Sequence, residues 1–311
     1  MNGIKMSATS YQLSTHNHQL LSWHGWQFAL PQDWNPVKIE GDWHKGSLVI
    51  ADFHATRLAV RWQAASGRKF DAPRWTQQAI AAEVGQLMLA QSTPFVPGKG
   101  FSVGRLFVEP QPPGRDVWVG QSTVTNRLIE IVYQTKIVSR LLRDTILPSI
   151  SDQPTGGPTH WAIFDLSCTA PAGWTLKSQR LNAGDLTLSF GMKNDVIIVR
   201  QLAPATLALS RQPLEKWLDA QQQIWKKMYR ASGEIQEFEP IDPVLTPATN
   251  TIIARTIRRR RRFFMLRWVA KQRVTLATHD RERGRIVLID ADRAERAEQM
   301  LASVGKAGNQ L

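Results

Sequence analysis

The chain has 311 residues, of which 42% are hydrophobic, so it is long enough for two domains with cores of their own and too apolar for the disordered class. Its formal net charge of +13 favours anionic partners. No apolar stretch approaches the roughly 20 residues of a membrane span, and the first residues show no secretory signal. We therefore expect a cytoplasmic protein.

The elements of the first half follow from local periodicity. Residues 1–20 are polar and aperiodic, and we expect a loose N-terminal arm. Residues 22–62 alternate apolar and polar positions, which predicts three or four strands. Pro73 in a first turn, followed by apolar residues at helical spacing, predicts a helix over 73–90. The half is completed by strands at 101–109, 116–123 and 127–134 and by a helix from Thr135.

The second half repeats this order after a break. Residues 148–160 hold three prolines and two glycines and are the predicted linker. Four strands are expected between residues 161 and 201, and a helix begins at Pro213 with Leu214, Trp217 and Leu218 on one face. The remaining expected elements are strands at 233–238, 250–257, 262–277 and 284–290 and a last helix over 291–304.

Short motifs recur in the same order in the two halves, which is typical of duplication. The matched pairs are Pro31-x-x-Trp34 and Pro171-x-x-Trp174, Gly46-x-Leu48 and Gly184-x-Leu186, Val60-Arg61 and Val199-Arg200, Trp118-Val and Trp268-Val, and Leu147-x-Ser149 and Leu301-x-Ser303. We predict an α+β protein of two tandem homologous domains, each a twisted antiparallel sheet with two packed helices. The first repeat is expected over residues 21–150 and the second, with a basic hairpin, over 161–311.

An aromatic-x-x-Pro-x-x-Trp phrase from Phe28 to Trp34, a Trp-bearing central helix and a last helix ending Leu-x-Ser-[Ile/Val] resemble the PsbP/DcrB-like superfamily. The resemblance covers residues 22–150 and 161–304. It implies a binding protein without catalytic residues, because members include photosystem accessory subunits, a Ran-binding factor, lipoproteins and chaperones of type VI secretion effectors. No functional residue transfers from it, and the basic tract departs from the family.

The candidate site is a run of cations in the second half. Five consecutive arginines are followed by aromatic residues and further cations, and such a run suits phosphates or carboxylates. The site residues are Arg258, Arg259, Arg260, Arg261, Arg262, Arg267, Lys271 and Arg273.

Three interpretations of the tract stay open. It protects a sheet edge from aggregation, it docks an acidic protein, or it binds nucleic acid with Phe263, Phe264 and Trp268 stacking on bases. Strand alternation and the match between Trp268 and Trp118 favour a core role for these aromatics, which places the acidic protein ahead of nucleic acid.

Three other groups of residues do not predict a metal, catalytic or redox site. Five of the seven histidines precede residue 55, but His16-x-His18 has no carboxylate or cysteine at a metal spacing, so we expect no metal. Asp290-Ala-Asp292 is expected to cap the last helix. Cys168 is the only cysteine, which excludes a zinc ribbon or a redox pair and predicts an inert buried thiol.

No nucleophile elbow, phosphate loop, dinucleotide fingerprint or zinc-protease motif is present. We therefore expect no cofactor and no enzyme, but a non-catalytic binding or adaptor protein that docks an acidic partner. The alternatives are a nucleic-acid-associated protein and a chaperone of a secreted effector.

Overall fold

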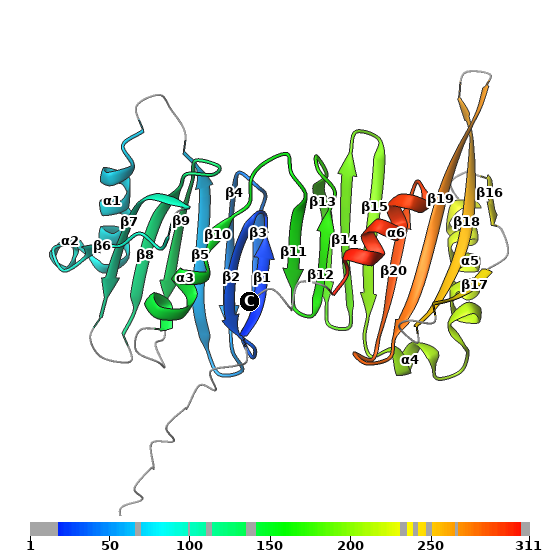
Figure 1. Ribbon diagram of the computed structural model, residues 1–311, viewed down its shortest axis with the longest axis horizontal. Coiled ribbons are helices and arrows are strands. Elements are labelled where there is room, and N and C mark those ends of the chain that lie inside the picture. Colours follow the sequence, from blue (N-terminus) through cyan, green and yellow to red (C-terminus); the bar gives the residue numbers. More distant parts are fainter. Residues whose placement is uncertain are drawn as a thin grey trace, which may run out of the picture. The chain divides into compact units, whose positions relative to one another are not determined.

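The structure is a computed structural model that describes residues 18–65, 70–98, 100–109, 114–134, 141–230, 235–238, 242–246, 251–264 and 267–305. The chain divides into two compact units (Figure 1). The first comprises residues up to Leu21 and Trp26–Asp152, and the second comprises Ser22–Gly25 and the chain from Gln153 onward. Strand β1 (His18–Trp23) therefore contributes residues to both units.

The first unit is built mainly of strands. Its elements are β2 (Trp26–Pro31), β3 (Asn35–Gly41), β4 (Lys45–Ala51), β5 (Thr56–Ala64), α1 (Ala72–Val84), α2 (Gln86–Leu89), β6 (Thr93–Pro94), β7 (Phe101–Val108), β8 (Asp116–Ser122), β9 (Arg127–Tyr133), the π-helix η1 (Leu142–Ile146), α3 (Leu147–Ser149) and β10 (Ser151–Asp152).

The second unit follows a similar order. Its elements are β11 (Thr159–Ile163), β12 (Leu166–Ala170), β13 (Thr175–Asn182), β14 (Asp185–Met192), β15 (Asp195–Leu202), α4 (Ala205–Leu209), α5 (Leu214–Arg230), β16 (Ile235–Phe238), β17 (Asp242–Thr246), β18 (Thr251–Phe264), β19 (Arg267–Asp280), β20 (Arg285–Ala291) and α6 (Ala294–Ser303).

The large sheets of the two units share one strand order. In the first unit the order is β3-β4-β5-β9-β8-β7-β6, and in the second it is β13-β14-β15-β20-β19-β18-β16, with β17 also paired to β18. In both, a three-strand meander leads through helices to later strands, and the last strand returns to pair with the third. This shared order supports the predicted duplication, which stays a prediction.

One face of each large sheet packs against a helix. In the first unit, Ile80 of α1 lies in a buried cluster with Phe107, Val117 and Val132. In the second unit, Leu214, Trp217 and Leu218 of α5 pack on Ala277 and Leu288. The helical spacing of apolar residues that predicted α5 is thus the spacing that buries it.

The closing segment of each unit is fixed by the same hydrogen bond. The backbone N–H of Ala29 donates to Ser149 Oγ at 2.8 Å, and the backbone N–H of Thr169 donates to Ser303 Oγ at 3.0 Å. Each serine also donates to the carbonyl three residues earlier, at 2.7 Å in both units. The Leu-x-Ser motif therefore has the same structural task in both halves.

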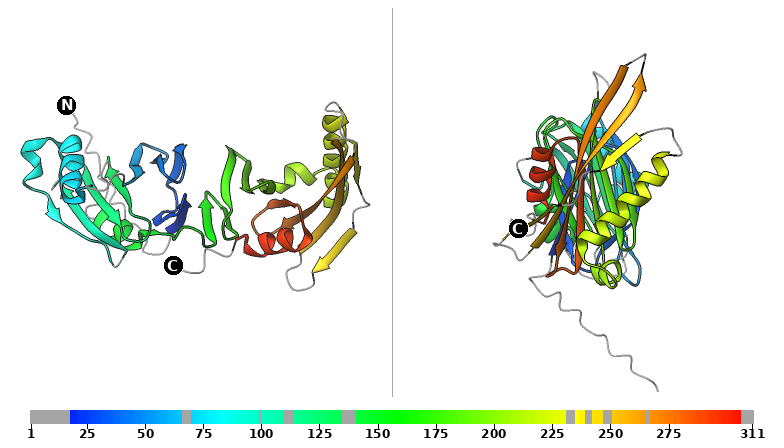
Figure 2. Two further views of the ribbon diagram at one scale, coloured as in Figure 1. Left: turned by 90° about the horizontal axis from the view of Figure 1, so that it is seen from above. Right: turned by 90° about the vertical axis from the view of Figure 1, so that its right-hand side faces the viewer.

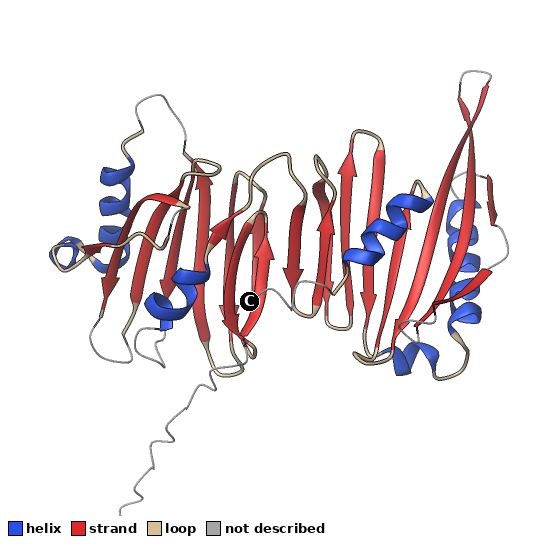
Figure 3. Cartoon of the chain, in the orientation of Figure 1, coloured by secondary structure: helices blue, strands red, loops and turns tan. Residues whose placement is uncertain are grey.

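The predicted fold class is wrong. About half of the described residues lie in strands and about a fifth in helices, so antiparallel sheets dominate (Figure 3). The first unit lacks the expected pair of packed helices in its described residues, because the second is reduced to η1 and the three-residue α3. Residues 135–140, where that helix was expected to begin, lie outside the described residues.

Segments expected as arm and linker contain strands. Residues 1–17 of the arm lie outside the described residues, but β1 begins at His18. Within 148–160, β10 pairs with β2 in the first unit, and β11 begins at Thr159 in the second. The predicted domain limits stay predictions, beside the division given above.

Large aromatic side chains lie in the cores of the two units. The buried tryptophans are Trp23, Trp26, Trp34, Trp62, Trp118, Trp161, Trp174 and Trp217. Cys168 is also buried in β12, and burial raises the pKa of its thiol to about 12, which confirms the prediction of an inert thiol.

Candidate functional site

The cross-strand register aligns the two units residue by residue. In the first unit Val60 pairs with Ile131, which pairs with Trp118. In the second unit Val199 pairs with Ile289, which pairs with Leu276. The position equivalent to Trp118 is therefore Leu276, and the sequence match of Trp118 to Trp268 is wrong.

The sequence match of Gly46-x-Leu48 to Gly184-x-Leu186 is also out of register with the strand pairing. Leu48 pairs with Val60 and Leu188 with Val199, so Leu48 is equivalent to Leu188 rather than to Leu186. Gly46 lies where the Trp62 ring crosses the strand, and an added Cβ would be 2.2 Å from Trp62 Cζ2. Gly184 instead occupies a turn with φ +77°, so the two glycines meet different needs.

The same alignment shows that one hairpin is longer in the second unit. The last pair of the β7–β8 hairpin is Val108 with Asp116, and its equivalent is Ile257 with Val274. Seven residues, 109–115, connect the strands in the first unit, and sixteen residues, 258–273, do so in the second. We call residues 258–273 the basic extension; the far end of the β18–β19 hairpin runs beyond the neighbouring strands (Figure 1).

All eight predicted site residues lie in the basic extension. Its sixteen residues include eight arginines or lysines and no acid, whereas residues 109–115 hold one acid and one arginine. The register places Arg258 opposite Arg273 and Arg260 opposite Lys271. Like charges in directly opposed positions destabilise a strand pair.

Most of the arginine tract lies between two neighbouring strands. Residues 258–261 pair with β19 on one side and with β16 on the other. Arg258–Arg261 therefore present no open backbone to another chain, whereas residues 267–273 of β19 pair with β18 alone, so edge protection stays an interpretation for the cations of β19.

Arg273 is held within the second unit. Its Nε donates to Asp290 Oδ1 at 2.9 Å, and its Nη2 donates to the carbonyls of Val196 and Asp290 at 3.1 Å. Its side chain is 18% exposed. Arg273 therefore fixes the base of the basic extension, while the other seven predicted residues are placed by backbone register.

The predicted cap of the last helix is wrong. The N-cap of α6 is Arg293, and it makes no side-chain capping bond. Asp290 pairs with Arg273, and Asp292 accepts from Arg296 Nη1 at 2.6 Å. Nearby arginines thus compete for these carboxylates more strongly than the free N–H groups do.

A second candidate is a hollow of about 740 Å³ in the first unit, beside α1. Trp75 and Ala79 line it, and Arg61 spans it between two carboxylates. Arg61 Nε and Nη2 donate to Glu130 at 3.0 and 2.7 Å, and Nη2 also donates to Glu83. Burial raises the pKa of Glu130, and Arg61 opposes that rise. Because Arg61 links α1 to the sheet, we interpret this network as structural.

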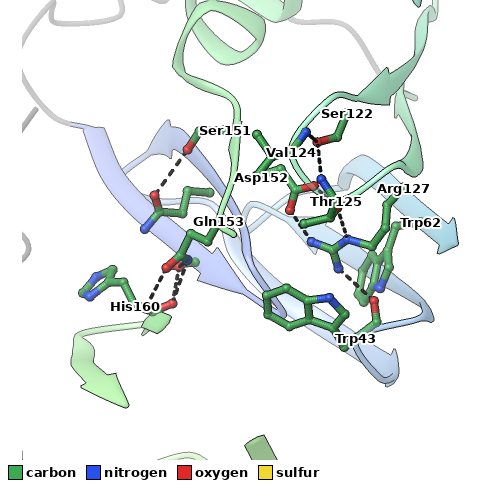
Figure 4. Close-up of polar contacts among 12 residues, drawn as sticks. Trp43, Trp62, Ser122, Val124, Thr125, Arg127, Ser151, Asp152, Gln153 and His160 are labelled. Carbon is green, nitrogen blue, oxygen red and sulfur yellow. Dashed lines mark hydrogen bonds and ion pairs between the residues drawn. The ribbon is translucent and has the colours of Figure 1, made fainter. Parts of the chain in front are cut away.

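Sequence reasoning missed a buried ion pair in the first unit. Arg127 forms an ion pair with Asp152, and both side chains are at most 2% exposed (Figure 4). Its guanidinium lies 4.6 Å from the Trp26 ring centroid and 4.4 Å from that of Trp43. Burial lowers the pKa of Arg127, and Asp152 opposes that shift. The sequence feature that could have revealed this ion pair is Arg127 itself, a charged residue at the start of the largely apolar strand that ends at Tyr133.

The histidines form no metal site in the described part of the chain, where no group of three His, Cys, Asp or Glu residues is arranged to hold a metal ion. His16 lies outside the described residues. In the second unit, the His160 backbone N–H donates to Gln153 Oε1 at 2.7 Å (Figure 4), and burial lowers the pKa of the His160 imidazole.

No protein-family model matches this chain, and no curated protein sequence matches it. Among the helices that the structure describes, none is long and apolar enough to cross a membrane. The resemblance to the PsbP/DcrB-like superfamily stays a prediction.

Proposed function

We propose that this protein is a non-catalytic binding protein whose second unit docks an acidic protein surface through the basic extension. One observation carries the proposal: all eight predicted cations fall within the sixteen-residue connection of the second hairpin, where the first hairpin has seven residues. The charge is thus added to a sheet whose strand order the first unit has without it.

The electrostatics of the free protein support a ligand. Opposed pairs such as Arg258 with Arg273 raise the energy of the folded hairpin. Of these two, Arg273 has a carboxylate partner in Asp290. An acidic surface would bring further carboxylates to this group of cations, and guanidinium groups bind carboxylates with two parallel hydrogen bonds.

The test removes the tract and keeps a matched control. In the test variant Arg258–Arg262 are replaced by Ser, and in the control five exposed arginines of the same unit are replaced by Ser, so both lose five charges. The control positions are Arg180, Arg211, Arg281, Arg283 and Arg293. Binding of a labelled Glu-rich peptide is followed by fluorescence anisotropy, and stability is followed by thermal melting.

We expect only the test variant to lose affinity. Exposed charge contacts contribute about 0.2–1 kcal/mol each, so five contribute roughly 1–5 kcal/mol, or at least about fivefold in Kd. The melting temperature should not fall, because like-charge pairs are removed. A lower melting temperature with unchanged peptide binding would contradict the proposal.

Nucleic acid is distinguished in the same assay. A single-stranded oligonucleotide that binds more tightly than the peptide, with a log–log salt slope of about −0.7 per neutralised phosphate, would replace the acidic protein by nucleic acid.

A further inference from the structure

The basic extension has two different faces. Successive residues of a strand alternate between faces, and directly opposed residues share one. The register is continuous from Ile253 to Phe264, so the alternation is unbroken. Even-numbered positions of β18 therefore lie on one face and odd-numbered positions on the other.

The even face is the face on which α5 packs. Ala277 is opposed to Ala254, an even position, and Ala277 lies in the buried cluster with Leu214 and Trp217 of α5. Helix α6 lies across the sheet from α5 (Figure 2, right). Within the basic extension the even face holds six cations, Arg258, Arg260, Arg262, Arg267, Lys271 and Arg273, with Phe264 and Val269 as its apolar positions.

The odd face combines cations with apolar positions. Arg259 is flanked by Glu237 of β16 and Gln272 of β19. Arg261 is flanked by Ile235 and Ala270, and Phe263 is opposed to Trp268; these pairs complete the odd face. Along this face the positions thus change from charged to apolar toward the end of the hairpin.

The core of the unit does not account for this aromatic pair. The core position equivalent to Trp118 is Leu276, which is buried, and Trp268 is eight residues away in the basic extension. The sequence argument for a core role of Trp268 rested on its match to Trp118, and that match is wrong. Phe263 and Trp268 therefore belong to the part of the hairpin that the first unit lacks.

We propose that the acidic partner docks on the odd face, and that its surface carries apolar side chains beside its carboxylates. This rests on the proposed function. Carboxylates would meet Arg259 and Arg261, and apolar side chains would cover Phe263 and Trp268, as an aromatic anchor is covered in a protein interface. A second copy of this chain is disfavoured as the occupant, because two such hairpins repel each other.

The experiment compares two labelled peptides with the same number of Glu residues. One has Gly and Ser between the acids, and the other has Leu and Phe. We expect the acidic–apolar peptide to bind at least about tenfold more tightly, since burial of apolar area adds to the charge contacts. Phe263→Ser with Trp268→Ser should abolish this difference, whereas Phe264→Ser, on the even face, should preserve it.

A second pair of variants tests the face itself. Arg259→Gln with Arg261→Gln and Arg258→Gln with Arg260→Gln remove the same charge from neighbouring positions. We expect the odd pair to weaken both peptides more than the even pair does. Equal losses, or a peptide preference that survives removal of Phe263 and Trp268, would overturn the inference.

The outcomes separate this inference from the proposed function. If both peptides bind equally and need the arginine tract, the inference fails and the proposed function stands. If neither peptide binds, both fail. Tighter binding to phosphatidylserine vesicles or to a single-stranded oligonucleotide would assign the odd face to lipid or nucleic acid and overturn the inference. Thermal melting identifies a variant that does not fold, and Trp268→Ser alone then replaces the double variant.

Discussion

Removing Arg127 should destabilise the first unit strongly. The Arg127 guanidinium lies between Trp26 and Trp43, donates to the Trp43 carbonyl at 2.8 Å and forms an ion pair with Asp152, whose side chain is 0% exposed. Arg127→Met leaves that carboxylate buried without its cation. Breaking a buried pair on one side costs about 3–5 kcal/mol, and the two cation–π contacts add about 0.5–2 kcal/mol each. We expect a loss of at least about 3 kcal/mol in the free energy of unfolding.

Urea unfolding of the full chain, followed by far-UV circular dichroism, measures this loss. The control is Lys38→Met, because Lys38 and Glu40 form an exposed pair at 3.0 Å and should contribute less than about 0.5 kcal/mol. The double variant Arg127→Met with Asp152→Leu should lose less than the sum of its single variants, since it leaves no buried charge. A loss below about 1 kcal/mol for Arg127→Met would refute the assignment of a desolvated ion pair.

Four further predictions follow from named contacts. Ser149→Ala and Ser303→Ala should each cost about 1 kcal/mol in urea unfolding, because each orphans one backbone N–H; a large loss at only one site would contradict their equivalence. The Cys168 thiol, with its pKa raised to about 12, should react with a thiol reagent only as the chain unfolds, and stoichiometric labelling of native protein would disprove its burial. Burial lowers the pKa of His160 below 6.5, so the contribution of the neutral imidazole to stability is complete above pH 6.5 and is lost as pH falls through the lowered pKa. The variant His160→Gln should therefore flatten the fall in melting temperature between about pH 7 and pH 5. An unchanged slope would exclude His160 as the source of that fall. Replacing residues 258–273 by the sequence of 109–115 should preserve cooperative unfolding and abolish binding of the Glu-rich peptide, whereas loss of folding would show that the basic extension is part of the core.

The sequence predicted elements best where their residues pack against a sheet. Pro213 and the apolar face of Leu214, Trp217 and Leu218 predicted α5, which begins at Leu214 and buries those side chains. The helix expected over 73–90 is confirmed over most of its length, but it is divided at Gly85, where φ is +87°. A glycine accepts this backbone conformation at little cost, so it ends α1 before α2 begins.

The fold class could not be read from the same signals, because several strands lack an apolar alternation. Most residues of β13 are exposed, and its strand conformation comes from pairing with β14. Strand β10 has two residues and lies in a segment whose prolines and glycines predicted a linker. Such strands depend on a partner that is distant in sequence, and a local pattern does not contain that partner.

The charge of the sequence located the candidate site, but the interpretation of its aromatic residues depends on the strand register. Trp118-Val and Trp268-Val read alike in sequence, and the match placed Trp268 in the core. The ladder through Ile131 and Ile289 shows that an extension of the hairpin separates them. Only the pairing of strands reveals which residues are added and which belong to the shared sheet.

The position of the basic extension explains how a binding surface can be added to the sheet without destabilising the core. Val274 and the four residues that follow it in β19 are buried, and Arg273, directly before them, pairs with Asp290. Residues of the hairpin beyond Arg273 can change in charge and length while the contacts of Ala277 with α5 stay the same. The first unit, with a seven-residue connection at the same place, has the same strand order. Stability therefore resides in the sheet that both units share, and the proposed function resides in the hairpin by which they differ.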